Sequence, residues 1–250
     1  MPSVTQRISQ VKQPRGGYLN PKDLDLVQLT NEVELAEIES IHASLVGLAV
    51  DYLTRFRLGT DIVEAFSISI LGARIIGEEL SCIRYLQKIK GLDDASISIA
   101  AKVVGYDVCF RAGPMGYRPV ETIVADKDTI GNIRIMVERS LAFFKKYGPI
   151  VKDGFTFEGG YTKIVETGDG DFLTKDTLWD FKVSGKDPTN KHTLQLLMYY
   201  LMGIHSKHSY FKEIKKVGIY NPRLNRVYTY NLANIPASVF SEIEKEVIGY

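Results

Sequence analysis

The chain has 250 residues, of which 45% are hydrophobic and 24% are charged, and its formal net charge is +1. A chain of this length and composition forms one large globular domain or two small ones, and its balanced charge excludes a global basic field, so that binding of nucleic acid would need a local patch. Two cysteines, Cys82 and Cys109, exclude a disulfide framework and a cluster held by four thiolates, and we interpret them as buried thiols in a reducing compartment.

The first 20 residues predict a flexible arm, because they are polar and contain Pro14 and a Gly16–Gly17 pair. They also lack the apolar core of a signal peptide. Nowhere does the sequence reach the roughly 20 consecutive apolar residues that a membrane-spanning helix needs. We therefore expect a cytoplasmic, soluble protein that has no membrane partner.

Residues 21–150 predict a helical region. Apolar residues recur at spacings of three and four in four segments, residues 32–56, 61–89, 94–110 and 129–148, and glycines interrupt the pattern between them. Each segment has an apolar stripe and a polar face, so these helices pack on one another or on a sheet. The same stripes could instead bind a protein partner or a second copy of the chain.

The pattern changes near residue 150. The segment FTFEGGYTKIV (155–165) alternates and is rich in aromatic and β-branched residues, which is typical of a strand. There follow a hairpin at 168–182, a helix from Thr189 or Asn190 to Gly203, two strands around a turn at 221–225, and a final helix that begins near Pro236. We therefore expect an α/β (α+β) fold in which residues 151–250 form a mixed sheet core flanked by helices.

The hairpin at 168–182, GDGDFLTKDTLWDFK, carries four aspartates. A turn centred on Lys175 and Asp176 places Asp171 directly opposite Asp180. Like charges at facing positions destabilise a sheet, so this pair of carboxylates needs a cation. A three-residue loop would instead place Asp171 opposite an aromatic position.

The same register places a lysine beside the two carboxylates. Because side chains alternate along a strand, Lys182 shares the face of Asp180 and lies opposite Asp169. The apolar residues of this strand face the other way: Trp179, Phe181 and Val183. Hard oxygen ligands suit Mg²⁺ or Mn²⁺ rather than zinc, and a lysine there can hold or help to deprotonate a metal-bound water. The alternative is a solvated charged surface, which is the default for a short motif of this kind.

The helix that follows the hairpin has a polar face formed by His192, Gln195 and Tyr199. This face can point toward the carboxylates, and the N-terminus of the helix can attract a phosphate. Alternatively, these residues are simply the exposed side of an amphipathic helix.

Three short motifs together resemble the PD-(D/E)xK nuclease superfamily. They are Gly-x-x-Asp at 168–171 (GDGD), Asp-x-Lys at 180–182 (DFK) and Gln-x-x-x-Tyr at 195–199 (QLLMY). The closest branch is the RecB-like one, which includes CRISPR adaptation nucleases. Order, spacing and strand-hairpin-helix context match over about residues 150–230, although the second acidic residue is Asp180 where the family more often has glutamate.

The resemblance implies a restriction-endonuclease-like fold and a nuclease that depends on Mg²⁺ or Mn²⁺. Asp171 and Asp180 would be metal ligands together with the backbone carbonyl of Phe181. Lys182 would position or activate the attacking water. Two further residues would orient the site or hold DNA: Gln195 and Tyr199.

Members of the RecB-like branch also place a histidine or glutamate from an early helix near the metal. By position, His42 is the best match in this chain. Glu158, on the strand expected at 155–165, is the second candidate for this acidic shell, and Glu138 is the third. Many relatives carry an iron–sulfur cluster held by four cysteines, and we expect none here because the chain has only two.

The expected substrate is DNA, held by local basic residues around Lys182. The nucleic-acid-binding candidates are Lys186, Lys191, His192, Arg223 and Arg226. Phosphate contacts of this kind give salt-sensitive binding. The two arginines could equally serve only the solubility of their turn. An RNA-directed nuclease remains open, and so does a non-catalytic nucleic-acid-binding or assembly module that keeps the nuclease fold.

Overall fold

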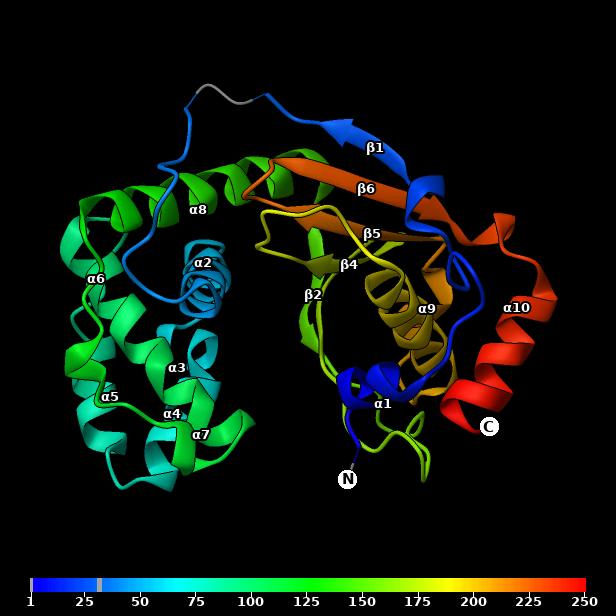
Figure 1. Cartoon of the computed structure of the whole chain (residues 1–250), viewed down its shortest axis with the longest axis horizontal. Coiled ribbons are helices and arrows are strands. Elements are labelled where there is room, and N and C mark those ends of the chain that lie inside the picture. Colours follow the sequence, from blue (N-terminus) through cyan, green and yellow to red (C-terminus); the bar gives the residue numbers. More distant parts are fainter. Residues whose placement is uncertain (1, 31–32) are drawn as a thin grey trace. The chain divides into compact units, whose positions relative to one another are not determined.

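The computed structural model describes residues 2–30 and 33–250, and its central feature is a six-stranded sheet (Figure 1). The strands lie in the order β1-β6-β5-β4-β3-β2, with β4 and β5 parallel and every other neighbouring pair antiparallel. Their bounds are β1 Asp25–Gln28, β2 Ile150–Phe155, β3 Gly170–Thr174, β4 Thr177–Phe181, β5 Lys216–Asn221 and β6 Arg226–Asn231. The chain therefore has a mixed α/β fold with a mostly antiparallel sheet.

The β3–β4 hairpin has the predicted register. Phe172 pairs with Trp179 and Leu173 with Leu178 across a turn at residues 175–176. Every residue of β4 is buried, as expected for a strand in the middle of a sheet with both faces covered. The register of the hairpin is therefore strongly specified, because a slip by one residue would move buried side chains to the opposite face of the sheet.

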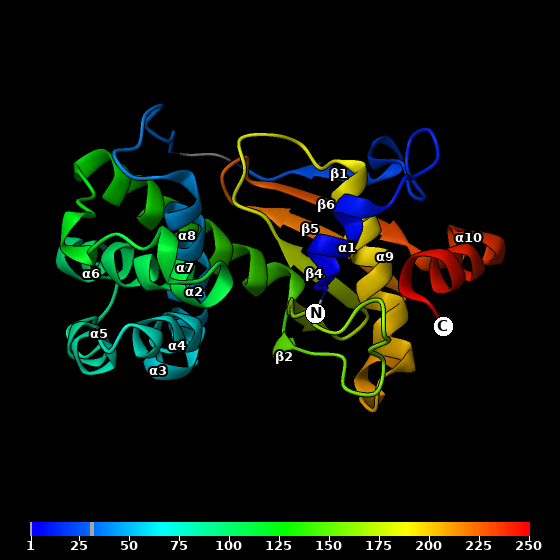
Figure 2. The ribbon, with the colours of Figure 1, turned by 60° about the horizontal axis from the view of Figure 1, so that its bottom comes forward.

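Helix α9 (Asn190–His205) covers one face of the sheet, and α1 (Val4–Gln10) lies beside it on the same side (Figures 1 and 2). The predicted apolar side of α9 is buried with Leu173 and Leu178 of the hairpin. Three phenylalanine rings complete this core: Phe155, Phe157 and Phe211.

The opposite face of the hairpin is covered by the last turn of α8 (Lys127–Tyr147). The ring of Phe144 lies 4.6 Å from that of Phe172, centroid to centroid, and Tyr147 packs edge-on against Trp179 at 5.7 Å. The alternation predicted for β4 is thus confirmed: its aromatic residues face α8, and its other face is turned toward α9.

The flexible arm predicted for residues 1–20 is wrong. Residues 4–10 form α1, which begins with a capping box in which Ser3 and Gln6 exchange side-chain-to-backbone hydrogen bonds. Val4, Ile8 and Leu19 are buried in the core beside α9. Two apolar residues in seven give too weak a periodicity to reveal a helix whose stability comes from packing.

Two further boundaries need correction. The first strand of the C-terminal region is β2, which ends at Phe155. Most of the predicted strand at 155–165 is a loop in which Gly159 adopts a positive φ of 92°. Helix α9 does not end at Gly203 but continues to His205. Gly203 lies inside the helix because Phe211 packs against it: an added Cβ would lie 2.3 Å from the ring.

The remainder of the C-terminal region follows the predicted order. Strands β5 and β6 flank the turn at 222–225, and α10 (Ala237–Glu242) begins after Pro236 and continues as a π-helical segment at Ile243–Ile248. Short 3₁₀ turns occur along the chain at Pro21–Asp23, Val104–Tyr106, Pro114–Gly116, Val120–Thr122, Ser209–Glu213 and Leu232–Asn234.

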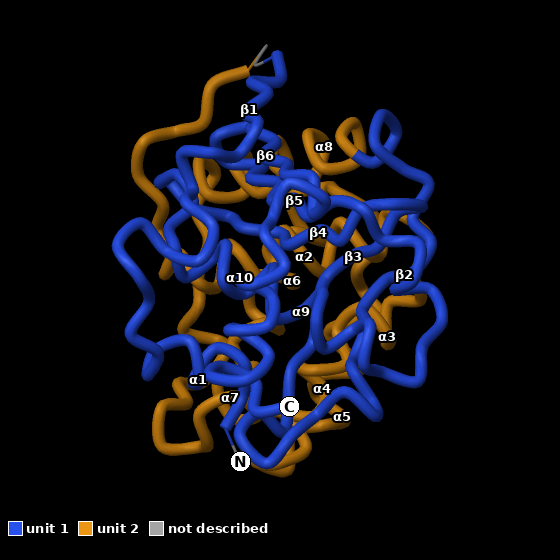
Figure 3. The backbone as a smooth tube through the Cα atoms, turned by 90° about the vertical axis from the view of Figure 1, so that its right-hand side faces the viewer, with its two compact units in different colours: residues 1–30, 144–250 blue, residues 31–143 orange. Residues whose placement is uncertain are grey.

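The chain divides into two compact units, one of residues 1–30 and 144–250 and the other of residues 31–143 (Figure 3). This corrects the predicted division at residues 20 and 150. Residues 25–28 supply the edge strand β1 to the sheet, and all four are exposed, so no hydrophobic alternation marked them as a strand. The sheet unit is therefore assembled from both ends of the chain.

The unit of residues 31–143 is helical, as predicted, but its helices are shorter than the sequence pattern suggested. The segment 32–56 becomes helical only at Ala43, and 61–89 is broken at Phe66 and near Gly77. Its helices are α2 Ala43–Arg57, α3 Ile62–Ala65, α4 Ser67–Ile75, α5 Glu79–Leu86, α6 Asp94–Val103, α7 Asp107–Arg111 and most of α8. Cys82 and Cys109 are buried free thiols in this unit. None of the helices in the described part of the chain combines the length and apolar character needed to cross a bilayer.

Candidate functional site

Two carboxylates meet on the α9 side of the β3–β4 hairpin. Asp171 and Asp180 lie one residue beyond the Phe172–Trp179 pair, which makes them facing positions in the register. The side chain of Asp171 reaches across the hairpin, where its Oδ2 accepts a hydrogen bond of 2.7 Å from the backbone N–H of Phe181. The two residues therefore occupy facing positions of the hairpin, as the predicted turn requires.

Asp180 is the most constrained of these groups, with only 1% of its surface exposed. Its Oδ1 accepts a hydrogen bond of 2.9 Å from Nζ of Lys182. Its Oδ2 is also buried, and no hydrogen-bond donor among the described residues reaches it. An unsatisfied buried acceptor costs roughly 1–3 kcal/mol, and more when it carries charge. This oxygen is a place where a ligand could bind.

Lys182 lies just after the end of β4, and its backbone N–H donates to the carbonyl oxygen of Tyr220, so the chain keeps its extended course beside β5. About a third of its side chain, 29%, is exposed. The ammonium group therefore meets both the buried carboxylate of Asp180 and the solvent. Asp169 lies outside β3, and the expected Asp169–Lys182 pair lies beyond the hydrogen-bonded ladder.

Helix α9 brings Gln195 and Tyr199 to this site. The side-chain amide of Gln195 donates to the hydroxyl of Tyr199 over 2.7 Å. Burial raises the pKa of Tyr199 well above its ordinary value, and the negative charges of Asp180 and Asp171 raise it further. Tyr199 is therefore a neutral hydroxyl beside the two carboxylates, and not the exposed residue that the alternative interpretation required.

His192 belongs to the same face of α9. Its Nδ1 accepts a hydrogen bond of 3.1 Å from the backbone N–H of Thr189, which closes the N-terminus of the helix. Burial lowers the pKa of His192, and the charge of Lys182 lowers it further while Asp180 opposes the effect. The imidazole is therefore a neutral neighbour of the Lys182–Asp180 pair.

Glu158 is not on a strand, and its carboxylate is engaged away from the hairpin. Both of its oxygens accept from the hydroxyl of Thr156, at 2.6 and 2.7 Å, and His208 contacts Oε2 at 2.7 Å. These partners, Thr156 first, lower the pKa of Glu158 to about 2. Glu158 therefore belongs to a surface cluster with Thr156 and His208, and not to the pair of Asp171 and Asp180.

His42 and Glu138 belong to the unit of residues 31–143, whereas the site described above is built from the sheet unit alone. The ring of His42 caps α2, where Nδ1 accepts from the backbone N–H of Ser44 at 3.2 Å. Glu138 lies on the exposed side of α8. Their roles at a metal stay predictions.

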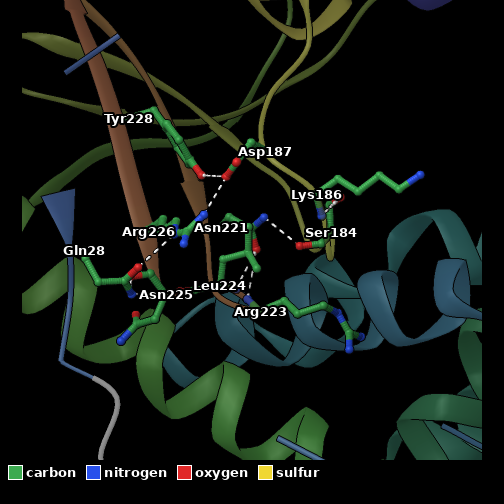
Figure 4. A network of polar contacts seen from close by, with 10 residues as sticks. All are labelled: Gln28, Ser184, Lys186, Asp187, Asn221, Arg223, Leu224, Asn225, Arg226 and Tyr228. Atoms are coloured by element: carbon green, nitrogen blue, oxygen red, sulfur yellow. Dashed lines mark hydrogen bonds and ion pairs between the residues drawn. The ribbon is translucent and has the colours of Figure 1, made fainter. Parts of the chain in front are cut away.

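Three of the basic residues after Lys182 lie in or beside a polar network: Lys186, Arg223 and Arg226 (Figure 4). The guanidinium of Arg226 already binds Asp187 at 2.7 Å and Gln28 at 2.8 Å, so it is not available to bind a phosphate. Lys186 is exposed, and Figure 4 shows its side chain and that of Arg223 extending away from this network. Lys191 is also exposed, in the first turn of α9.

Asn221 is a residue that the sequence analysis missed. It is 2% exposed, and its side-chain amide donates to the carbonyl of Ser184 at 2.8 Å. Its Oδ1 accepts from the backbone N–H groups of Arg223 and Leu224 at 3.0 and 3.2 Å (Figure 4). Asn221 therefore ties the loop after Lys182 to the β5–β6 turn. The sequence feature that could have indicated this role is the position of Asn221 directly before Pro222 in a turn.

In the described residues, no group of three or more histidine, cysteine, aspartate or glutamate side chains is arranged to hold a metal. The hairpin instead offers two carboxylates on adjacent strands, a buried unpartnered oxygen and a lysine. Comparisons with protein-family models, with curated proteins and with solved structures found no match for this chain. The functional argument therefore rests on the chain's own residues.

Proposed function

We propose that this protein is a metal-dependent nuclease that hydrolyses phosphodiester bonds of DNA, with a restriction-endonuclease-like core of the PD-(D/E)xK, RecB-like type. The observation that carries the proposal is the buried Oδ2 of Asp180, which has no donor among the described residues although it lies beside Asp171. Three short motifs within residues 168–199, GDGD, DFK and QLLMY, also lie on the α9 side of the hairpin.

These residues fit Mg²⁺ or Mn²⁺. Carboxylate and carbonyl oxygens are the ligands that hard divalent cations prefer, and two carboxylates plus one carbonyl leave room for water and phosphate oxygens. Asp171, Asp180 and the backbone carbonyl of Phe181 would hold the ion. When bound, such an ion acidifies water and offsets the charge of a phosphoryl group.

Lys182 has the position required of a group that handles the attacking water. Its ammonium is held by Asp180 at 2.9 Å yet remains partly exposed, so it can hydrogen-bond a water or a phosphate oxygen without leaving the carboxylate. A fixed positive charge of this kind stabilises negative charge that develops on phosphoryl oxygens.

Gln195 and Tyr199 act as orienting groups. Because Tyr199 is neutral and anchored by Gln195, its hydroxyl is a fixed dipole beside the acidic pair. The exposed residues Lys186 and Lys191 and the N-terminus of α9 provide positive potential for the phosphate backbone of DNA. Such contacts give binding that weakens as the salt concentration rises.

The proposal is tested by incubating the protein with single- and double-stranded DNA and RNA in Mg²⁺, Mn²⁺ or EDTA. We expect cleavage of DNA with either metal and none with EDTA. Lys182→Ala should abolish cleavage, whereas Lys175→Ala, at the exposed turn of the same hairpin, should not. Cleavage that survives EDTA or Lys182→Ala would contradict the assignment of the site.

Metal binding has a readout that does not depend on activity. Saturating Mg²⁺ should stabilise the wild-type protein against unfolding, by about 2.7 kcal/mol at one hundred times the dissociation constant. If Mg²⁺ stabilises the protein and DNA binds but no nucleic acid is cleaved, the chain is a binding module that kept the fold. RNA cleavage without DNA cleavage would change the substrate and leave the site in place.

A further inference from the structure

The unit of residues 31–143 contains a cavity of ≈ 680 Å³ that the proposed nuclease site does not use. Its walls come from residues 40–42 and the first turns of α2, from α7 and the segment before it, and from residues 116–124. Volumes of roughly 300–1,000 Å³ are typical of pockets that bind small molecules. The cavity is therefore large enough to enclose a ligand of its own.

The interior of this cavity is aliphatic. Its apolar lining includes Leu45, Leu48, Val104, Val108 and Ile123. No phenylalanine, tyrosine or tryptophan lines it, so it lacks the rings on which a nucleobase would stack. An aliphatic ligand body gains most from such walls, because the hydrophobic effect scales with the apolar area removed from water.

The charged groups around this cavity are two arginines and one aspartate. Arg111 and Arg118 line it, and the only acid in its lining is Asp107. Asp107 is 1% exposed and is already hydrogen-bonded by Ser69 and Tyr52, both at 2.6 Å. Its charge is therefore turned inward and its oxygens are satisfied.

The two arginines differ in their hydrogen bonding. The guanidinium of Arg111 donates to Asp107 at 3.5 Å and to the hydroxyl of Tyr52 at 3.3 Å. Arg118 is exposed, and no hydrogen bond or ion pair of its side chain occurs within the described residues. A fixed arginine and an uncommitted one beside an aliphatic cavity match a ligand with one anionic head group.

We propose that this cavity binds a small organic anion with an aliphatic body, such as a medium-chain carboxylate. The carboxylate would pair with Arg118 and Arg111, and the chain would lie between Leu48 and Val108. This binding site stands independently of the proposed nuclease activity, since Asp171, Asp180, Lys182, Gln195 and Tyr199 do not line the cavity. His42 is the one residue of its lining that the sequence also offered as a candidate metal ligand.

The test uses octanoate as the probe, with 1-octanol and octylammonium as matched ligands that lack the anionic head group. Calorimetry with the full chain should show binding of octanoate, at least tenfold weaker binding of 1-octanol and no binding of octylammonium. Arg118→Gln should weaken octanoate binding roughly 10- to 100-fold, the range expected for a charge-assisted hydrogen bond. Arg57→Gln removes an exposed arginine that does not line the cavity and should leave the affinity unchanged.

Methyl NMR locates the ligand without any substitution. Octanoate should shift the methyl signals of the cavity residues: Leu45, Leu48, Val104, Val108 and Ile123. Absence of octanoate binding at millimolar concentration overturns the proposal. It is also overturned by equal binding of octylammonium, by equal affinities of Arg118→Gln and Arg57→Gln, or by shifts confined to other methyl groups.

Discussion

Asp107 in the helical unit and Asp180 in the sheet unit are buried to the same extent, each 1% exposed, yet their hydrogen bonding differs. Both oxygens of Asp107 accept short hydrogen bonds, from Ser69 and Tyr52 at 2.6 Å. Asp180 has Lys182 on one oxygen, and the other oxygen has no donor among the described residues. Burial alone therefore does not distinguish a carboxylate with complete hydrogen bonding from one with an open oxygen.

The completeness of the hydrogen bonding does distinguish them. A buried carboxylate with all its donors present stabilises the fold through those bonds, and removing it leaves its partners unsatisfied. A buried carboxylate with an open oxygen costs stability by itself and is favourable only when something else binds there. The comparison therefore predicts opposite consequences for the same substitution at the two positions.

The largest expected effect is on catalysis by Asp180→Asn. Loss of a ligand to the ion should lower the rate of DNA cleavage roughly a thousandfold or more, because metal catalysis supplies several kcal/mol. Asp107→Asn should leave the rate per folded molecule unchanged. Rates are measured in Mg²⁺ at a temperature where both variants are folded. Equal losses in the two variants would remove the distinction between the two aspartates.

The second-largest expected effect is on stability, where Asp107→Asn should cost more than Asp180→Asn. Asp107→Asn should destabilise the helical unit by about 3 kcal/mol, because the amide keeps only one acceptor oxygen and its NH₂ cannot accept the other of the two hydrogen bonds from Ser69 and Tyr52. Asp180→Asn should cost little or nothing, since it removes a buried charge with an open oxygen. Urea unfolding followed by far-UV circular dichroism reports mostly on the helices.

Fluorescence supplies the internal control for this experiment. Trp179 is the only tryptophan of the chain and lies in β4 of the sheet unit. For Asp107→Asn, the circular dichroism transition should move to lower urea concentration more than the fluorescence transition does. A larger shift for Asp180→Asn than for Asp107→Asn would contradict the argument from hydrogen bonding.

Asn221 tests whether the loss of stability on substitution depends on the completeness of hydrogen bonding and not on which of the two units holds the residue. It lies in the same unit as Asp180 and is nearly as buried, but both its Nδ2 and its Oδ1 are hydrogen-bonded, to Ser184 and to Arg223 and Leu224. Asn221→Ala should therefore destabilise the sheet unit by about 2 kcal/mol, as measured by Trp179 fluorescence. The exposed cap Asn231, which accepts one hydrogen bond from Ala233, is the matched control and should cost less when replaced by alanine. Equal costs for the two asparagines would show that burial adds nothing here.

The hairpin could be predicted from the sequence because its information is local. The two-residue turn and the alternation from Asp171 to Lys182 determine the register and the face of each side chain. The order of strands and helices after residue 150 followed for the same reason. The fold class and the pairing of Asp171 with Asp180 were therefore accessible without any structure.

The features that escaped prediction depend on distant packing. Helix α1 is recognisable only with α9 beside it, and the exposed strand β1 only with β6. The open oxygen of Asp180 and the tether made by Asn221 are properties of atoms brought together by the whole sheet. Glu158 looked like a site residue in an alternating segment, and its partner His208 is fifty residues away.

The smallest expected effect concerns the charge of Asp180 itself, with His192 as its reporter. Burial and Lys182 lower the pKa of His192, and the negative charge of Asp180 raises it. A histidine whose folded pKa is lowered binds fewer protons than in the unfolded chain, so stability should fall as the pH drops through about 6.5, the ordinary value. Protonation would also break the bond from Thr189 to Nδ1.

Asp180→Asn should lower the pKa of His192 further, because a favourable negative charge is lost. Asp107→Asn should leave that pKa unchanged, and Lys182→Met should raise it. NMR titration of the His192 imidazole measures all three, with His42, an exposed cap in the other unit, as the reference signal. An unchanged pKa of His192 in Asp180→Asn would contradict the contribution of the Asp180 charge to that pKa.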